Sequence, residues 1–133
     1  MSDTSSKKQV VLLVDDDQFL LNMYALKFRN SGFDVEAVNN ASIALQKLRD
    51  GFLPSMILCD LVMPTMDGLT FIKQLKEERL ATSSAIVVLS NQSQSSDIDQ
   101  AKALSVDGYI VKASTIPSEV VEEVRKILSK KTK

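Results

Sequence analysis

Five short apolar segments alternate along the chain with longer segments in which apolar residues have helical spacing. The apolar segments cover residues 10–14, 33–38, 56–59, 85–89 and 108–111. Most of them are continuously apolar, which is typical of strands that are buried on both faces of a parallel sheet. The pattern therefore predicts five strands in a parallel arrangement.

Between these segments, apolar residues recur every three or four positions, as they do on one face of a helix. The recurring residues are Leu20, Met23, Tyr24 and Phe28; Ala41, Ala44, Leu45 and Leu48; Leu69, Ile72 and Leu75; Ile98, Ala101 and Leu104; and Val120, Val121, Val124, Ile127 and Leu128. Each set forms a stripe that can cover a sheet, so we predict five helices. The alternation of strands and helices indicates an α/β fold with right-handed crossovers.

Short polar side chains precede several of these helices. An Asp, Asn, Ser or Thr just before a helix can accept a hydrogen bond from a free backbone N–H of the first turn. We predict this capping role for Asp17, Asn40, Ser96 and Thr115.

The composition is that of one globular domain. The chain has 133 residues, of which 44% are hydrophobic and 25% charged, and this length is hard to divide into two independent cores. We predict a tail over residues 1–8, one domain over residues 9–130 and a second tail over residues 131–133. No apolar run approaches the ~20 residues that span a bilayer, and the polar N-terminus lacks the apolar stretch of a secretory signal.

The net charge and the numbers of cysteine and histidine residues limit the chemistry that is possible for this chain. Sixteen basic and seventeen acidic residues leave a net charge of −1, without the basic excess of a general nucleic-acid binder. We therefore expect no direct contact with nucleic acid or membrane. A single cysteine, Cys59, cannot form an internal disulfide, which favours a reducing compartment such as the cytoplasm. The absence of histidine excludes Ser-His-Asp catalysis, His-ligated zinc and a phosphohistidine carrier role.

Polar residues follow four of the five predicted strands. Asp15, Asp16 and Asp17 follow the first strand, Asp60 the third, Ser90 the fourth and Lys112 the fifth. Open α/β sheets bind their ligands at this carboxyl edge. Clustered carboxylates raise one another's pKa, and a hard divalent cation such as Mg²⁺ relieves that conflict. An aspartate at such a site can also attack a phosphoryl group and form an acyl phosphate.

Four segments of the chain resemble the receiver domain of response regulators, the signalling proteins of two-component systems. These segments are VLLVDD at residues 11–16, ILCDLVMPTMDG at residues 57–68, VVLS at residues 87–90 and GYIVK at residues 108–112. The resemblance covers about residues 9–130. It implies a flavodoxin-like, doubly wound domain with five helices and a five-stranded parallel sheet in the order 2-1-3-4-5.

The resemblance also implies a role for each matching residue. Asp60 would accept a phosphoryl group from a sensor histidine kinase or a phosphotransfer protein. Asp15, Asp16, Asp60 and the backbone carbonyl of Val62 would hold Mg²⁺. The protein would not be a conventional enzyme, because it would catalyse only its own phosphorylation and dephosphorylation.

The remaining matches concern the phosphoryl group and the switch. Ser90 and Lys112 would contact the phosphoryl oxygens, and the aromatic ring of Tyr109 would rotate when Ser90 moves. Pro64 and Gly68 would shape the loop after Asp60. Val62 and Gln92 match positions that, in the family, tune the lifetime of the acyl phosphate. We expect the apolar Val62 to favour a long-lived state because it orients no attacking water.

The implied output is a protein contact made by the surface of the fourth helix, fifth strand and fifth helix. Ile98, Lys102, Tyr109 and Val120 are candidates for this contact, and equally for ordinary core and rim positions. We expect a monomer or a phosphorylation-dependent dimer. The chain is expected to be a stand-alone receiver, similar to a chemotaxis regulator, or a fragment of a larger regulator.

Two residues depart from the family pattern. Ala113 follows Lys112, where the family usually has a proline after a cis peptide bond. A cis bond costs ~2.5–4 kcal/mol before alanine, against ~0.5–1 kcal/mol before proline, so either the site sustains the cis bond or the bond is trans and the loop is rebuilt. Asn91 stands where a small residue is common, and its side chain can crowd the entrance for the phosphoryl group.

Three other readings of the same residues stay open at this point. A haloacid-dehalogenase-type phosphohydrolase would use the D-x-D pair, with Asp15 as nucleophile and Asp17 as general acid. A flavin-binding domain has a similar topology, although its first loop needs hydroxyls and amides instead of aspartates. A pseudo-receiver would use the fold for protein contacts without phosphorylation.

Overall fold

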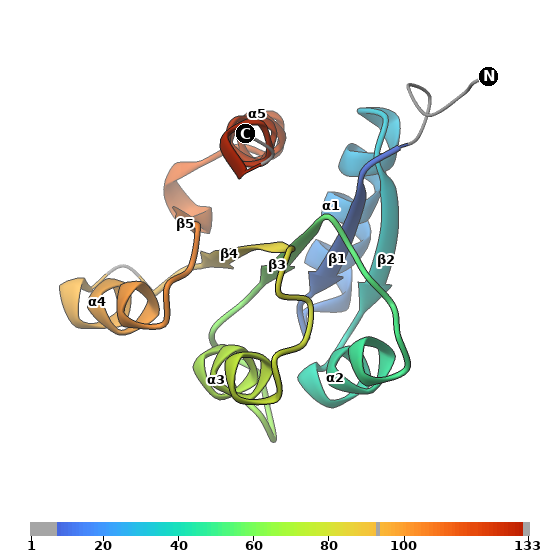
Figure 1. The fold of residues 1–133 in the computed structure, drawn as a ribbon. Helices are drawn as coiled ribbons and strands as arrows, with labels where there is room; N and C mark the ends of the chain where they lie inside the picture. The colour runs from blue at the N-terminus through green and yellow to red at the C-terminus, as the bar shows by residue number, and fades with distance from the viewer. Residues whose placement is uncertain (1–7, 93, 132–133) are drawn as a thin grey trace.

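Five parallel strands pair in the order β2-β1-β3-β4-β5 (Figure 1). The computed structural model describes residues 8–92 and 94–131. The strands are β1 (Val10–Val14), β2 (Asp34–Val38), β3 (Met56–Cys59), β4 (Ala85–Ser90) and β5 (Gly108–Val111). The predicted strand order and the predicted α/β class are therefore confirmed.

Five α-helices connect the strands. They are α1 (Gln18–Asn30), α2 (Ala41–Arg49), α3 (Gly68–Glu78), α4 (Ser95–Ala103) and α5 (Pro117–Lys131), and a short 3₁₀ helix, η2 (Lys112–Ser114), follows β5. Lys131, which we placed in the C-terminal tail, is the last residue of α5. Most of the predicted N-terminal tail and the last two residues lie outside the described ranges.

The helices cover both faces of the sheet, with α1 and α5 on one face and α2, α3 and α4 on the other (Figure 1). Alternate residues of β1 enter the two cores, because successive side chains of a strand point to opposite faces. Val11 and Leu13 pack with Tyr24 of α1, whereas Leu12 and Val14 pack with Phe71 of α3. This double burial explains why the sequence of β1 is continuously apolar.

The predicted helix caps are right in two cases and wrong in two. The carboxylate of Asp17 accepts a hydrogen bond from the N–H of Leu20, and the side chain of Asn40 accepts one from Ile43. Ser96 instead lies inside α4, which begins at Ser95 after an N-cap residue without a side-chain bond. Thr115 is also not a cap, because its hydroxyl donates to the carbonyl of Val111 and α5 begins two residues later.

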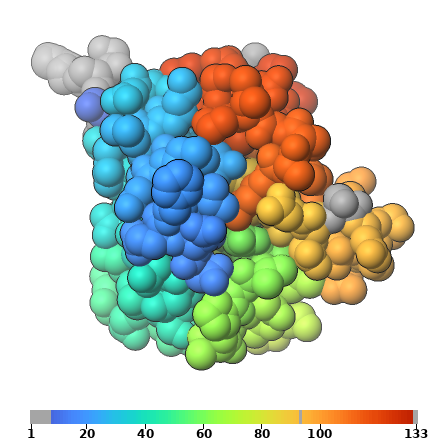
Figure 2. Space-filling view, turned by 180° about the vertical axis from the view of Figure 1, so that it is seen from behind, coloured from blue at the N-terminus to red at the C-terminus, as the bar shows by residue number. Residues whose placement is uncertain are grey.

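Helix α4 is the least embedded helix of the fold. Ala101 is its single fully buried residue, and the gold and orange α4 segment projects at one side of the molecule in Figure 2. Of the four candidates for partner contact, Lys102 is exposed and Ile98 and Tyr109 are half-buried. Val120 is fully buried against the sheet, so of the two alternatives left open for it, the core position is the one that the structure has.

Within the described ranges, we find no helix that is both long enough and apolar enough to span a membrane.

Candidate functional site

Two buried carboxylates and one lysine meet at the carboxyl edge of the sheet. Asp15 follows β1 and is 2% exposed, and Asp60 follows β3 and is 8% exposed. The ammonium group of Lys112, which follows β5, donates to Asp15 Oδ2 at 2.7 Å and to Asp60 Oδ2 at 3.0 Å. The pairing of β1 with β3 places the two aspartates side by side, and Lys112 reaches them from the edge of the sheet.

The backbone fixes the second oxygen of each carboxylate. Asp15 Oδ1 accepts a hydrogen bond from the N–H of Asp17 at 3.0 Å, and Asp60 Oδ1 accepts one from the N–H of Val62 at 3.2 Å. Both bonds join residues two positions apart, as Asp and Asn side chains do in turns. Each carboxylate is thus held by a turn on one oxygen and by Lys112 on the other.

Burial and hydrogen bonding shift the pKa values of Asp15 and Lys112. Burial raises the pKa of Asp15, and the opposing hydrogen bonds from Lys112 and from the N–H of Asp17 do not cancel that effect. Burial alone would lower the pKa of Lys112, but the bonds to Asp15 and Asp60 outweigh it, so the pKa of Lys112 lies above its usual value. The lysine therefore stays charged at neutral pH and compensates the two acidic groups.

A third carboxylate, from the exposed Asp16, completes an acidic cluster. Oxygens of Asp15, Asp16 and Asp60 lie within 4.8 Å of one another. Carboxylate oxygens are the ligands that Mg²⁺ takes in proteins, usually one or two of them with water or phosphate filling the other positions. The donor set of this cluster fits such an ion.

The cluster opens into a surface pocket between the strand-to-helix loops. Its lining consists of Asp16, Asp17, Leu20, Asp60, Val62, Ser90, Asn91, Gln92 and Lys112. The chain therefore brings together the residues that we predicted for phosphoryl chemistry, and it exposes Asp60 to the pocket. Leu20 was not predicted, because its helical spacing marks it only as part of an apolar stripe.

Two hydrogen bonds in the loop after β4 connect this pocket to β5. The hydroxyl oxygen of Ser90 accepts a hydrogen bond from the N–H of Gln92 at 3.2 Å. The hydroxyl group keeps one hydrogen that can donate into the pocket. The hydroxyl of Tyr109 donates to the carbonyl of Gln92 at 2.6 Å. The backbone of one residue thus connects a pocket side chain to an aromatic side chain on β5.

Gly68 allows the loop after Asp60 to fold back on itself. Its N–H donates to the carbonyl of Leu61 at 2.8 Å. A Cβ atom at this position would lie 2.2 Å from the carbonyl oxygen of Asp60 and 2.8 Å from the Cα of Leu61. Earlier in the loop, the carbonyl of Pro64 accepts a hydrogen bond from the N–H of Met66 at 2.7 Å.

This arrangement of carboxylates, lysine and hydroxyl agrees with a sequence match over most of the chain. Residues 11–125 match the family of the response regulator receiver domain. The chain belongs to that family.

Known relatives and solved structures are consistent with this assignment. The DNA-binding response regulator MtrA of Mycobacterium tuberculosis is 30% identical over 118 residues, which are 89% of this chain and 50% of MtrA. The chain thus spans about half the length of the curated relatives that it matches. The chemotaxis protein CheY4 of Vibrio cholerae has a TM-score of 0.83 at 23% identity, with 91% of this chain and 99% of that chain covered. A receiver domain protein of Methanospirillum hungatei has a TM-score of 0.85 at 21% identity, with 95% and 98% covered, and these two structures support the fold alone.

The segment after Lys112 shows how this receiver domain is built without a proline. The Lys112–Ala113 bond is trans, and the chain continues as the 3₁₀ helix η2. Of the two outcomes that we considered, a cis bond sustained by the site and a trans bond with a rebuilt loop, the structure has the second. Sequence reasoning missed one feature of this loop, which is that the hydroxyls of Ser114 and Thr115 both donate to the carbonyl of Val111.

Proposed function

We propose that Asp60 is the phosphoryl acceptor of this receiver domain. The observation that carries the proposal is the sharing of Lys112 between Asp15 and Asp60 beside a pocket that Asp60 lines. An oxygen of Asp60 would attack the phosphorus of a phosphohistidine in the donor. A P–O bond forms, the P–N bond breaks, and its electron pair returns to the imidazole ring. Later attack of water on phosphorus would restore the carboxylate and release inorganic phosphate.

The charged side chains around Asp60 have separate tasks in this reaction. Lys112 would leave Asp15 and pair with a phosphoryl oxygen, while the hydroxyl of Ser90 would donate to another. Asp15, Asp16 and Asp60, with the predicted backbone carbonyl of Val62, would hold Mg²⁺. When bound, that ion neutralises charge on the transferring phosphoryl group.

Asp15 is less suited to be the nucleophile that a phosphohydrolase of the D-x-D type requires. It is more deeply buried than Asp60 and does not line the pocket. The carboxylate of Asp17, which would be the general acid of such an enzyme, accepts the capping bond of α1. These contacts favour phosphorylation at Asp60.

Phosphoramidate is a suitable donor for the test, because it presents a P–N bond as phosphohistidine does. With Mg²⁺, intact-mass spectrometry should detect one added phosphoryl group on the wild type and none on Asp60→Asn. Chelation of Mg²⁺ should abolish the addition, and Asp15→Asn should slow it without abolishing it. Equal phosphorylation of Asp60→Asn and the wild type would contradict the proposal.

The connection through Gln92 supports a conformational switch. A phosphoryl oxygen that draws Ser90 inward would pull the N–H of Gln92, whose carbonyl is held by Tyr109. The ring of Tyr109 would turn with it, and the surface of α4, β5 and α5 would change. We propose that a downstream protein binds there, and that the chain is a monomer or a phosphorylation-dependent dimer.

NMR spectra can follow the switch when beryllofluoride, a phosphoryl analogue, is added with Mg²⁺. Amide signals of α4 and β5 should shift in the wild type. In Tyr109→Phe, which loses the hydroxyl alone, the analogue should still bind and the shifts in α4 should shrink. If α4 and β5 signals stayed fixed in the wild type, a pseudo-receiver that acts without phosphorylation would be the better description.

Val62 lies at the pocket with 58% of its surface exposed. We propose that this apolar side chain prolongs the acyl phosphate, because it offers no hydrogen bond to an attacking water, and that Gln92 contributes to the same property. The half-life of phosphorylated Val62→Asn should be shorter than that of the wild type. Equal half-lives would remove the role of Val62.

We further propose that the donor is a sensor histidine kinase or a phosphotransfer protein in the cytoplasm. The family membership and the absence of histidine from the chain support this assignment. The phosphohistidine must then come from a partner, and the reducing compartment fits the buried free thiol of Cys59.

A further inference from the structure

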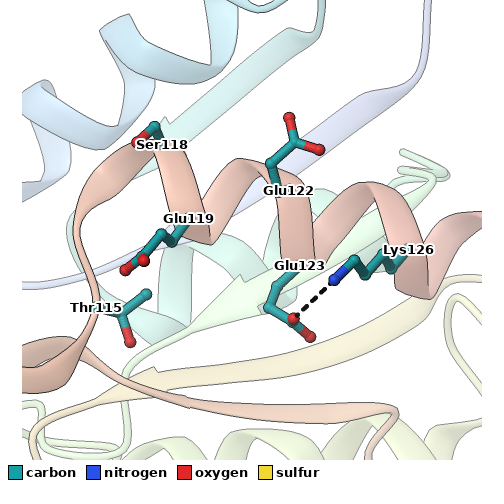
Figure 3. A pocket seen from close by; sticks show the side chains of 6 residues that line it. All are labelled: Thr115, Ser118, Glu119, Glu122, Glu123 and Lys126. Carbon is teal, nitrogen blue, oxygen red and sulfur yellow. Dashed lines mark ion pairs between the residues drawn. The ribbon is translucent and has the colours of Figure 1, made fainter.

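Two hydroxyl groups converge on the last carbonyl of β5. The hydroxyl of Thr115 donates to the carbonyl of Val111 at 2.9 Å, and the hydroxyl of Ser114 donates to the same oxygen at 3.3 Å. The N–H of Thr115 also donates to the carbonyl of Lys112 at 3.3 Å. Figure 3 shows Thr115 in the segment that leads into α5. Both peptide carbonyls that flank the α-carbon of Lys112 are therefore bonded to Thr115.

This location matters because Lys112 leaves the sheet at its edge. Among the strands of the described ranges, β5 pairs with β4 alone, and the pairing ends at Val111. The ladder of the sheet therefore does not fix the backbone of Lys112. The side chain of lysine is a flexible four-carbon stem, so the position of its ammonium group depends on where the backbone places the α-carbon.

At the far end of the Lys112 side chain, the ammonium group is held closely by two carboxylates. It lies 2.7 Å from Asp15 and 3.0 Å from Asp60, and the side chain is 8% exposed. A small rotation of the backbone at Lys112 would move the ammonium group away from both carboxylates. The two bonds from Thr115 oppose such a rotation, and the bond from Ser114 adds to them.

We propose that Thr115, assisted by Ser114, is a positioning residue that aims Lys112 at Asp15 and Asp60. In this chain the two hydroxyls hold the loop that begins with the trans Lys112–Ala113 bond. The proposal rests on the proposed role of Lys112 in binding the phosphoryl group. It adds that loss of the Thr115 hydroxyl changes two binding equilibria in opposite directions.

The opposite directions follow from what Lys112 does to each ligand. Its ammonium group is bonded to two of the three carboxylates that would hold Mg²⁺, so a less firmly held lysine competes less and Mg²⁺ binds more tightly. A phosphoryl analogue on Asp60 needs the same ammonium group as a partner, so it binds more weakly. One neutral hydrogen bond corresponds to about a fivefold change in an equilibrium constant.

The test compares Thr115→Val, which keeps the shape and removes the hydroxyl, with Thr115→Ser, which keeps the hydroxyl. Ser118→Ala is the matched control, because Ser118 is an exposed hydroxyl residue in the first turn of α5 (Figure 3). Titrations of backbone amide signals would give the affinity for Mg²⁺ alone, and then for beryllofluoride at saturating Mg²⁺. Thermal unfolding of each variant would show that it is folded.

Thr115→Val should bind Mg²⁺ about fivefold more tightly and beryllofluoride about fivefold more weakly, in line with the loss of one hydrogen bond. Ser114→Ala should change both affinities in the same directions by less, because its bond is longer and its side chain is exposed. Thr115→Ser and Ser118→Ala should resemble the wild type.

Two results would overturn the positioning role. One is wild-type affinity for both ligands in Thr115→Val, and the other is a parallel weakening of both affinities, which a general loosening of the fold would cause. A wild type that does not bind beryllofluoride would contradict the proposed phosphoryl site instead. In that case the affinity for Mg²⁺ alone would still test the position of Lys112.

Discussion

Replacement of Lys112 by methionine tests how much the central ion cluster depends on its one cation. Methionine has a similar length and no charge, so the variant would leave Asp15 and Asp60 facing each other without compensation. The side chains of Lys112, Asp15 and Asp60 are 8%, 3% and 11% exposed, and water therefore screens their interaction only weakly. We expect Lys112→Met to be destabilised strongly in buffer without divalent metal.

The magnitude follows from the two bonds that are lost. Each hydrogen bond between charged groups contributes about 1.5–3 kcal/mol, and removal of one partner from a buried ion pair typically costs about 3–5 kcal/mol. We therefore expect the free energy of unfolding to fall by about 3–5 kcal/mol at neutral pH. In a chain of this size each kcal/mol lowers the melting temperature by roughly 4 °C, so Tm should fall by roughly 10–20 °C.

The loss should depend on pH with a definite sign. Burial already raises the pKa of Asp15, and without the lysine that pKa rises further. A carboxyl group whose pKa is higher in the folded state than in the unfolded state takes up a proton more readily when folded, so acidification favours the fold. The deficit of Lys112→Met should therefore be largest near pH 7 and should shrink as the pH falls toward about 4.

Thermal unfolding followed by circular dichroism measures these effects. Lys112→Met/Asp15→Asn should recover much of the loss, since it removes one of the two facing charges. Millimolar Mg²⁺ should raise the Tm of Lys112→Met more than that of the wild type, because the ion no longer competes with an ammonium group. A Tm within a few degrees of the wild type, or an equal response to Mg²⁺ in both proteins, would refute this account of the cluster.

Three further predictions concern other parts of the fold. Gly68→Ala should lower both Tm and the rate of phosphorylation, because its Cβ would lie 2.2 Å from the carbonyl oxygen of Asp60; unchanged unfolding would show that the loop can move aside. Hydrogen bonds from Arg49 and then from Gln74 lower the pKa of Glu78 to about 2, so the stabilising effect of these bonds should be present above the usual pKa of a glutamate and be lost as the pH falls toward about 2. An NMR titration of Arg49→Gln should show the pKa of Glu78 raised toward its usual value, with the bond from Gln74 still holding it somewhat lower. Cys59 is fully buried and burial raises its pKa, so iodoacetamide should label it only after unfolding, and rapid labelling of the native protein would contradict its burial.

The strands of the sheet could be predicted largely from residue type, because a buried strand position is occupied by an apolar residue. Strands β1, β3 and β5 begin and end at the predicted positions. Burial on both faces accounts for the continuous apolar sequence of β1 and β3, whereas β5 is an edge strand with mostly half-buried residues. At β2 the predicted start was one residue early. Phe33 is apolar for another reason, because its ring packs edge-to-face on Phe28 at 5.3 Å.

Parts of the site that depend on distant partners were not predictable from pattern. Thr115 has the residue type of a helix cap and lies shortly before α5, yet its hydroxyl donates to the carbonyl of Val111. No local propensity distinguishes this donation from the acceptance of a capping bond. The hydrogen bond between Tyr109 and Gln92 is accepted by a backbone carbonyl, which every residue has, so the sequence gives no sign of it. The clustering of Asp15, Asp60 and Lys112, in contrast, follows from the strand order once the family is known.

The central claim is that the phosphoryl group is attached to Asp60, and chemical mapping tests it most directly. Borohydride reduces an acyl phosphate of aspartate to homoserine, which peptide mass spectrometry can locate after treatment with phosphoramidate and Mg²⁺. The account predicts homoserine at position 60 of the wild type, and none at positions 15 and 16. Homoserine at position 15, or at any position in Asp60→Asn at the wild-type level, would contradict it.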